Sequence, residues 1–113
     1  MTIQPGIYNF TLQRRADFEL DLQFKDSTNS AIDLTGATAY AQAWNESRTK
    51  KSADFSVAYT DRSNGQIKIS LTDAQTSALP DELHYDVLIE NASGKREYYL
   101  EGVITVNQGY TEP

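Results

Sequence analysis

Few residues of this sequence could support catalysis. His84 is the only histidine, and the chain has no cysteine. A serine or threonine nucleophile needs a base and an orienting acid, so any catalytic triad would have to include His84. No Gly-x-Ser-x-Gly turn lies near His84, and a zinc site would need three or four ligands from one histidine and scattered carboxylates. We therefore expect a protein that is not an enzyme, with no catalytic residue, no metal site and no cofactor.

Acidic side chains occur in pairs on one side of an extended segment, as Glu19 and Asp21 do, and likewise Asp86 and Glu90. Glycosidase chemistry requires two acids that converge across a cleft. Both pairs lie on the outward side of predicted strands, which places them on flat solvent-facing surfaces. We expect these carboxylates to contribute solubility rather than chemistry.

An aromatic contact surface is the alternative to catalysis. Within residues 38–44, Tyr40 and Trp44 alternate with small alanines. Either the alanines or the aromatic residues must face the core, and periodicity alone does not choose between the two phases. Our hypothesis is that the alanines face inward, where small side chains let two sheets approach; the opposite phase is the alternative. The inward alanines predict an exposed partner interface, rimmed by acidic residues and formed by Tyr40, Trp44, Leu88, Tyr99 and Val103.

These residues need strands to position them, and the clearest strand is the segment Phe18–Lys25. Its four apolar residues alternate with polar ones without exception, which a helix would distribute around its circumference. Similar patterns predict strands at 7–12, 38–44, 55–60, 66–71, 85–89 and 96–106. Thr72 and Gln75 form a capping box that predicts a short helix over 73–79, and Asn64-Gly65 predicts a hairpin turn. Residues 45–53 are expected to be a polar loop, with the basic residues Arg48, Lys50 and Lys51 in solvent.

Seven short strands with regularly spaced turns indicate an all-β fold, an immunoglobulin-like antiparallel β-sandwich of about seven strands with one short helical turn. Tyr85, two residues before the apolar Val87, stands where such folds place a tyrosine corner. In this arrangement the strands at 38–44, 85–89 and 96–106 share one sheet. Gly102 interrupts the last of them and predicts a bulge or a close backbone approach. A five-stranded, partly open barrel is the alternative fold.

Length and charge limit the classes of function. The 113 residues predict a single domain over 1–113, with 107–113 as a flexible tail. The net charge of −6 opposes the phosphate backbone, so we expect no nucleic-acid partner. The beginning of the chain lacks the pattern of a secretion signal, and no stretch reaches membrane-spanning length, which predicts synthesis in the cytoplasm and no membrane partner.

An ordered series of short motifs resembles a family of bacteriophage virion proteins. The series covers roughly residues 18–106 and comprises the strand Phe18–Lys25, the motif Asp33-Leu-Thr-Gly36, Asn64-Gly65 with the strand that follows, Tyr85-Asp-Val-Leu-Ile-Glu90, Ser93-Gly94-Lys95 and Leu100-Glu-Gly-Val-Ile-Thr-Val106. It is similar to the immunoglobulin-like domain at the N-terminus of siphophage baseplate upper proteins and to related stand-alone phage proteins.

The resemblance implies a structural protein of the virion, made in the host cytoplasm, which attaches or adapts tail, baseplate or fibre components. Its partners would be other virion proteins and copies of itself, without a small-molecule ligand. The long receptor-binding extension of the larger members is absent from the given sequence, which favours an adaptor. A capsid decoration protein is one alternative. A carbohydrate-binding module, with Tyr40, Trp44 and Tyr99 as a stacking platform, is an alternative of another class.

Overall fold

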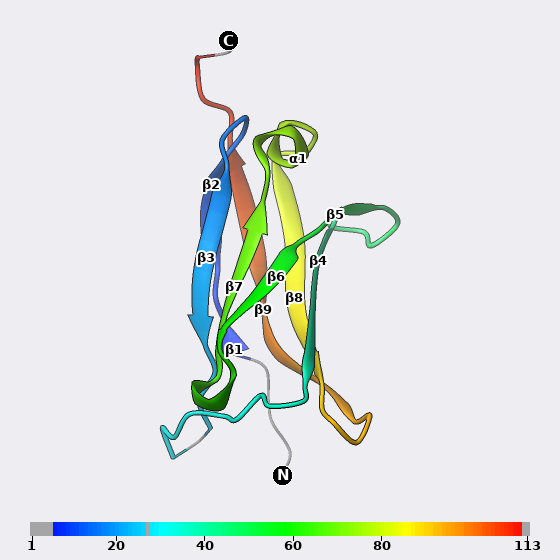
Figure 1. The fold of residues 1–113 in the computed structure, drawn as a ribbon. Coiled ribbons are helices and arrows are strands. Elements are labelled where there is room, and N and C mark those ends of the chain that lie inside the picture. Colours follow the sequence, from blue (N-terminus) through cyan, green and yellow to red (C-terminus); the bar gives the residue numbers. More distant parts are fainter. Residues whose placement is uncertain (1–5, 27, 112–113) are drawn as a thin grey trace.

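The computed structural model describes residues 6–26 and 28–111, which form two packed β-sheets (Figure 1). The larger sheet contains β1 (Gly6–Ile7), β2 (Phe10–Gln13), β4 (Thr38–Trp44), β5 (Lys51–Asp54), β8 (Glu82–Glu90) and β9 (Arg96–Asn107). The smaller sheet contains β3 (Phe18–Gln23), β6 (Ser56–Asp61) and β7 (Gln66–Leu71). Two short helices connect strands: the 3₁₀ turn η1 (Arg62–Asn64) and α1 (Asp73–Ser77).

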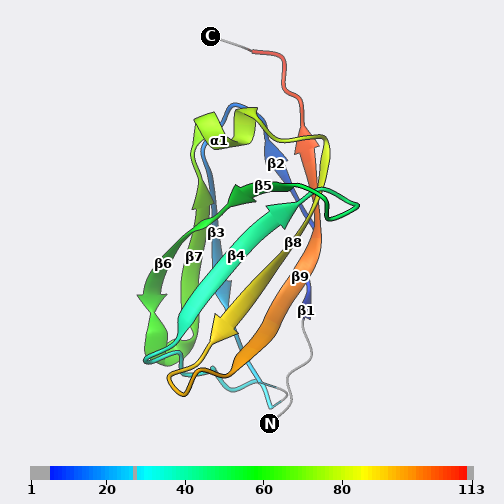
Figure 2. The same ribbon diagram turned by 90° about the vertical axis from the view of Figure 1, so that its right-hand side faces the viewer.

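The order of the strands is that of an immunoglobulin-like sandwich. The larger sheet runs β1-β9-β8-β4-β5, with β2 also on β9, and the smaller sheet runs β3-β7-β6. All pairs are antiparallel except that β1 and β2 run parallel to β9. Figure 2 shows β4, β8 and β9 side by side in one layer, with β3, β7 and β6 in the layer behind them. The predicted fold class is therefore confirmed, as is the shared sheet of residues 38–44, 85–89 and 96–106.

The core lies between the sheets and follows from the alternation of side chains along each strand. On β7, Ile67, Ile69 and Leu71 are buried, and on β8 the buried residues are Leu83, Tyr85, Val87 and Ile89. The alternating face of β3 packs against this cluster and ends in the buried Phe24. A continuous apolar layer of this kind leaves the outer faces of both sheets free to carry polar side chains or a binding site.

The local predictions hold in part. The capping box is present, since the Thr72 hydroxyl accepts from the Gln75 amide and the Gln75 side chain accepts from the Thr72 amide. The helix ends at Ser77, two residues earlier than predicted. The turn at Asn64-Gly65 is a 3₁₀ turn rather than a two-residue hairpin, and Gly65 takes the positive φ of 69° that closes it. The predicted polar loop over 45–53 is wrong at its end, because β5 begins at Lys51 and pairs with β4.

The predicted tyrosine corner is not formed, and Tyr85 instead bonds to the first strand segment. Its buried hydroxyl donates to the carbonyl oxygen of Tyr8, 77 residues upstream, rather than to the chain just before it. In a regular parallel ladder that carbonyl would accept from the amide of Val103. The side chain of Asn9 replaces it there, accepting from Val103 at 2.8 Å. This exchange explains why the first predicted strand, 7–12, is divided into β1 and β2.

The end of the domain at β2 and α1 is held by two arginines. Arg14 donates to the carbonyl of Leu79 and forms an ion pair of 3.0 Å with Asp81. Arg15 donates to the backbone oxygens of Gln108 and Thr111. The bonds of Arg15 tie the chain after β9 to the domain at the end where it leaves the sandwich (Figure 1). The flexibility predicted for 107–113 stays a prediction, and 112–113 lie outside the described residues.

Candidate functional site

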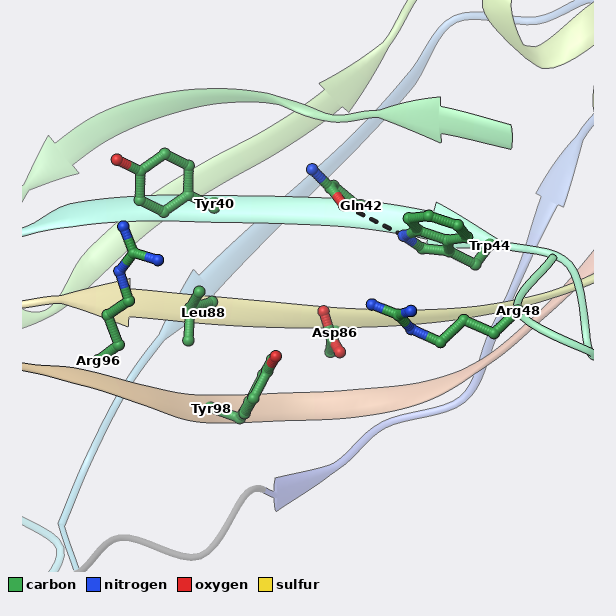
Figure 3. Close-up of a pocket in the computed structure, with 8 residues that line it drawn as sticks. All are labelled: Tyr40, Gln42, Trp44, Arg48, Asp86, Leu88, Arg96 and Tyr98. Atoms are coloured by element: carbon green, nitrogen blue, oxygen red, sulfur yellow. Dashed lines mark hydrogen bonds between the residues drawn. The ribbon is translucent and has the colours of Figure 1, made fainter. Parts of the chain in front are cut away.

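The outer face of the larger sheet is hollowed between β4 and β9. A hollow of about 320 Å³ crosses β8, lined by Tyr40, Gln42, Trp44, Arg48, Asp86, Leu88, Arg96 and Tyr98 (Figure 3). Four of its eight lining residues are charged or amide side chains, and three are aromatic. A concave site with aromatic walls and a few convergent polar groups is the usual form of a ligand or partner site.

The phase of β4 places its aromatic residues on this face. Ala39, Ala41 and Ala43 are buried, with Ala43 at 0% exposure, whereas Tyr40 is 44% exposed. The hypothesis of inward alanines is therefore confirmed, and Tyr40 and Trp44 both line the hollow. Small side chains on β4 let the second sheet come close, which leaves no room for an inward tryptophan.

The predicted position of Tyr99 is wrong, because β9 contains a bulge. Val87 pairs with Leu100, but the next residue of β8, Leu88, pairs with Tyr98, so that Tyr99 is an extra residue in the ladder. Tyr99 turns towards the smaller sheet and packs edge-on against Phe24, with 5.5 Å between the ring centroids. Tyr98 stands on the outer face in its place and is 50% exposed.

Leu88 and Val103 both lie on the predicted outer face, but only Leu88 lines the hollow. Val103 pairs with His84, which in turn pairs with Trp44 across the sheet. Val103 is therefore on the same outer face but two strands from Trp44, and it lines none of the hollow. Gly102, next to it, makes the predicted close backbone approach, since a Cβ there would lie 2.0 Å from the Tyr8 carbonyl oxygen.

The turn after β4 brings Arg48 over the sheet. The Asn45 side-chain oxygen accepts from the amides of Thr49 and Lys50 at 2.8 and 3.1 Å, which closes the turn. Arg48 takes a positive φ of 56° there, and its guanidinium lies 4.7 Å from the centre of the Trp44 ring. Arg48 lies in an exposed loop as expected, and its head group also reaches towards Asp86 in the hollow (Figure 3). A guanidinium over an aromatic face is attracted by the ring quadrupole.

Asp86 lies on the floor of the hollow without a partner. It is half-buried, and no hydrogen bond or ion pair to it exists among residues 6–26 and 28–111. Burial raises the pKa of its carboxyl above the ordinary 3.8, Arg48 opposes that rise, and Glu101, directly opposite on β9, adds to it. A partly desolvated carboxylate with a raised pKa, next to aromatic side chains in a hollow, is a common feature of binding sites. Sequence reasoning missed it because the alternation on β8 gives Asp86 the pattern of any solvent-facing residue.

The other end of the hollow is organised by Glu90. One of its oxygens accepts from Arg96 at 3.3 Å, and the other accepts from the Tyr40 hydroxyl at 3.5 Å. At the opposite end, the Trp44 ring N–H donates to the Gln42 side chain at 3.1 Å. Tyr40 and Trp44 are thus oriented by polar neighbours, while the Asp86 carboxylate accepts no hydrogen bond from the described residues.

Asp86→Asn is expected to raise the melting temperature at pH 7. The pKa of the Asp86 carboxyl is higher in the folded state than in the unfolded state. At a pH between these two pKa values the folded protein binds more protons than the unfolded protein, so the protein loses stability as the pH rises through this range. The gain in the variant should therefore shrink as pH falls and vanish below about pH 3, where the carboxyl is protonated in both states. Thermal unfolding of both proteins between pH 3 and pH 7 measures it, and a melting temperature lower than wild type at pH 7 would contradict it.

Other chemistry finds no support in the described residues. Between residues 6 and 111, residue 27 excepted, no three His, Cys, Asp or Glu side chains cluster in a way that would hold a metal ion. No helix in that part of the chain is long and apolar enough to cross a membrane.

Comparison with known proteins adds little to the geometry. No protein-family model and no curated protein matches the chain. Among solved structures, the chain is similar to the filamin domain of Lin-41, with 14% identity, a TM-score of 0.49, and 88% of this chain and 84% of that chain covered. The immunoglobulin-like class of the fold follows from the strand order itself.

Proposed function

We propose that this protein is a non-catalytic structural module of a bacteriophage particle, which joins neighbouring components of the tail or baseplate. The observation that carries the proposal is the aromatic outer face of the larger sheet, where Tyr40 and Trp44 on β4 and Tyr98 on β9 stand on either side of β8, which carries Leu88. Tyrosine and tryptophan are enriched at the energetically important positions of protein interfaces, where they surround well-packed pockets. The ordered motifs over residues 18–106 support a phage particle as the setting.

The geometry of the face suits attachment better than catalysis. Two of its aromatic side chains, Tyr40 and Trp44, are hydrogen-bonded to Glu90 and Gln42, so these two would lose less side-chain freedom when a partner packs against them. The rim carries both signs of charge: Arg96 is ion-paired with Glu90, Arg48 lines the hollow, and Glu101 is the neighbour of Asp86 on β9. Mixed rim charge favours a defined orientation of the partner. A repeated module in a symmetric particle needs such a defined orientation in every copy.

Tyr98→Ala is expected to lower incorporation of the protein into particles at least tenfold, because truncation of an aromatic hot spot costs about 2 kcal/mol or more of binding free energy. Tyr8→Ala is the matched control, since Tyr8 has nearly the same exposure, 46% against 50%, but lies outside the hollow. Quantitative immunoblots of purified particles give the measurement. Equal incorporation of Tyr98→Ala and wild type would rule out this face as the attachment surface.

A capsid decoration protein would use the same face at a different place in the particle. Cryo-electron microscopy of particles that carry the protein separates the two locations, because tail and capsid have different symmetry. Density for the sandwich on the capsid lattice would show that the protein is a capsid decoration protein and not a tail adaptor. The absence of the protein from purified particles would reject both.

A further inference from the structure

We propose that the hollow on the larger sheet is a saccharide-binding site that holds one sugar ring between Tyr40 and Tyr98, with Asp86 accepting hydrogen bonds from its hydroxyl groups. This inference goes beyond the proposed function, because it concerns a glycan rather than a protein neighbour. Both proposals use Tyr40 and Tyr98, so the saccharide site concerns the protein while no neighbour covers this face.

The spacing of the two tyrosines suits a single ring. Tyr40 and Tyr98 are the direct cross-strand neighbours of Leu88, one on each side. Neighbouring strands lie about 4.8 Å apart, so the backbones that carry the two tyrosines are separated by about 9.6 Å. A ring in contact with both side chains, at about 3.5–4 Å from each, needs about 7–8 Å. Figure 3 shows Leu88 on the strand between the two tyrosines, with the Tyr40 ring seen face-on over β4 and the Tyr98 ring seen edge-on over β9.

The polar groups around this space suit a ring that carries several hydroxyls. Asp86 offers a carboxylate that forms no hydrogen bond within the described residues, and Arg48 reaches towards it. Arg96 lies at the opposite end, beside Tyr40. A sugar hydroxyl is both donor and acceptor, so it would bond to the carboxylate at one end and to guanidinium groups at both ends. The C–H faces of the same ring would pack against the tyrosines.

Other ligand classes suit the hollow less well. A purely apolar ligand would desolvate Asp86 further and leave it without a partner. A cation would face Arg48 and Arg96, one at each end. A nucleotide would bring phosphate to a chain with a net charge of −6. The volume of about 320 Å³ is near the lower limit of ligand pockets, which run from about 300 to 1,000 Å³, and limits the occupant to a small unit of a glycan.

The test is a titration of ¹⁵N-labelled protein with a panel of methyl glycosides of common hexoses, N-acetylhexosamines and uronic acids. We expect at least one glycoside to shift amide signals of β4, β8 and β9 around Leu88, with an affinity in the millimolar range typical of so small a ligand. Asp86→Asn, which should fold at least as well as wild type, is expected to weaken that affinity at least tenfold, as is Tyr98→Ala. Tyr8→Ala is expected to leave the affinity unchanged.

The outcomes separate this inference from the proposed function. No shift from any glycoside overturns the saccharide site, as would shifts that Asp86→Asn and Tyr98→Ala leave unchanged. Shifts at the hollow with a nucleoside but with no glycoside would assign it to a planar base instead, and would overturn it too. Incorporation into particles is measured separately. Both proposals would be supported if the Asp86→Asn protein is incorporated into particles in normal amounts and the wild-type protein binds glycosides.

Discussion

Gly102→Ala is expected to destabilise the protein by about 3 kcal/mol or more, because the added methyl group would occupy the place of the first strand segment. A Cβ at this position would lie 2.0 Å from the carbonyl oxygen of Tyr8 and 2.8 Å from its carbonyl carbon. Both atoms belong to the backbone, so no side-chain rotation relieves the clash. The segment around Tyr8 must move away from β9, and the Tyr85 hydroxyl would then lose its acceptor inside the core.

Urea unfolding followed by tryptophan fluorescence measures this change, with Gly6→Ala as the matched control. Gly6 also belongs to the parallel pairing with β9, but a Cβ there would meet its nearest neighbour, a side-chain carbon of Leu100, at an ordinary 3.7 Å. The control should stay within about 0.5 kcal/mol of wild type. An unfolding midpoint of Gly102→Ala equal to that of the control would show that the first segment adapts without cost.

The two-layered fold could be predicted because alternation determines which face of a strand is buried. Residues 18–24 illustrate this. Glu19, Asp21 and Gln23 lie on one face of the strand and could not be buried together, so the opposite, apolar face must point to the core. The same reasoning fails for β5, whose four residues alternate neither in polarity nor in burial. That strand exists because its backbone pairs with β4 after the turn, which is a tertiary cause that the sequence of β5 does not encode.

The candidate site could be predicted only in part, for a reason specific to β9. Tyr98 and Tyr99 are identical neighbours, so exchanging their faces changes neither the composition of the core nor that of the surface. The bulge that exchanges them is a matter of register between β8 and β9, which periodicity within β9 alone cannot reveal. Gly102, the residue that suggested an irregularity, marks the close approach of Tyr8 instead.

The polar members of the hollow were missed because each looks ordinary in its own segment. Asp86 has the pattern of an outward strand residue, and Arg48 lies in a polar loop. One local feature could have drawn attention to Arg48: Asn45 precedes a turn rich in small polar residues, and asparagine side chains close such turns by accepting backbone amides. That closure is what brings Arg48 back over Trp44.

Ala43→Leu and Trp44→Ser are expected to have opposite consequences, although the two residues are neighbours on β4. Ala43 is fully buried between the sheets, so three additional carbon atoms should force the layers apart at a cost of about 1–3 kcal/mol. Trp44 lies on the outer face and is half-buried, so its truncation loses the contact with Arg48 at 4.7 Å, worth about 0.5–1 kcal/mol, and the packing of its ring on the sheet, but it opens no cavity between the sheets. The smaller residue therefore tolerates substitution worse than the larger one.

Thermal unfolding followed by far-ultraviolet circular dichroism compares the two variants without relying on tryptophan fluorescence. The same preparations can be assayed for incorporation into particles, where Trp44→Ser should reduce attachment while its fold stays almost unchanged. A tryptophan that filled a core site would instead cost about 3–5 kcal/mol on truncation. Loss of that size in Trp44→Ser, together with a stable Ala43→Leu, would mean that the alanines face solvent. The aromatic surface on the larger sheet would then not exist in solution.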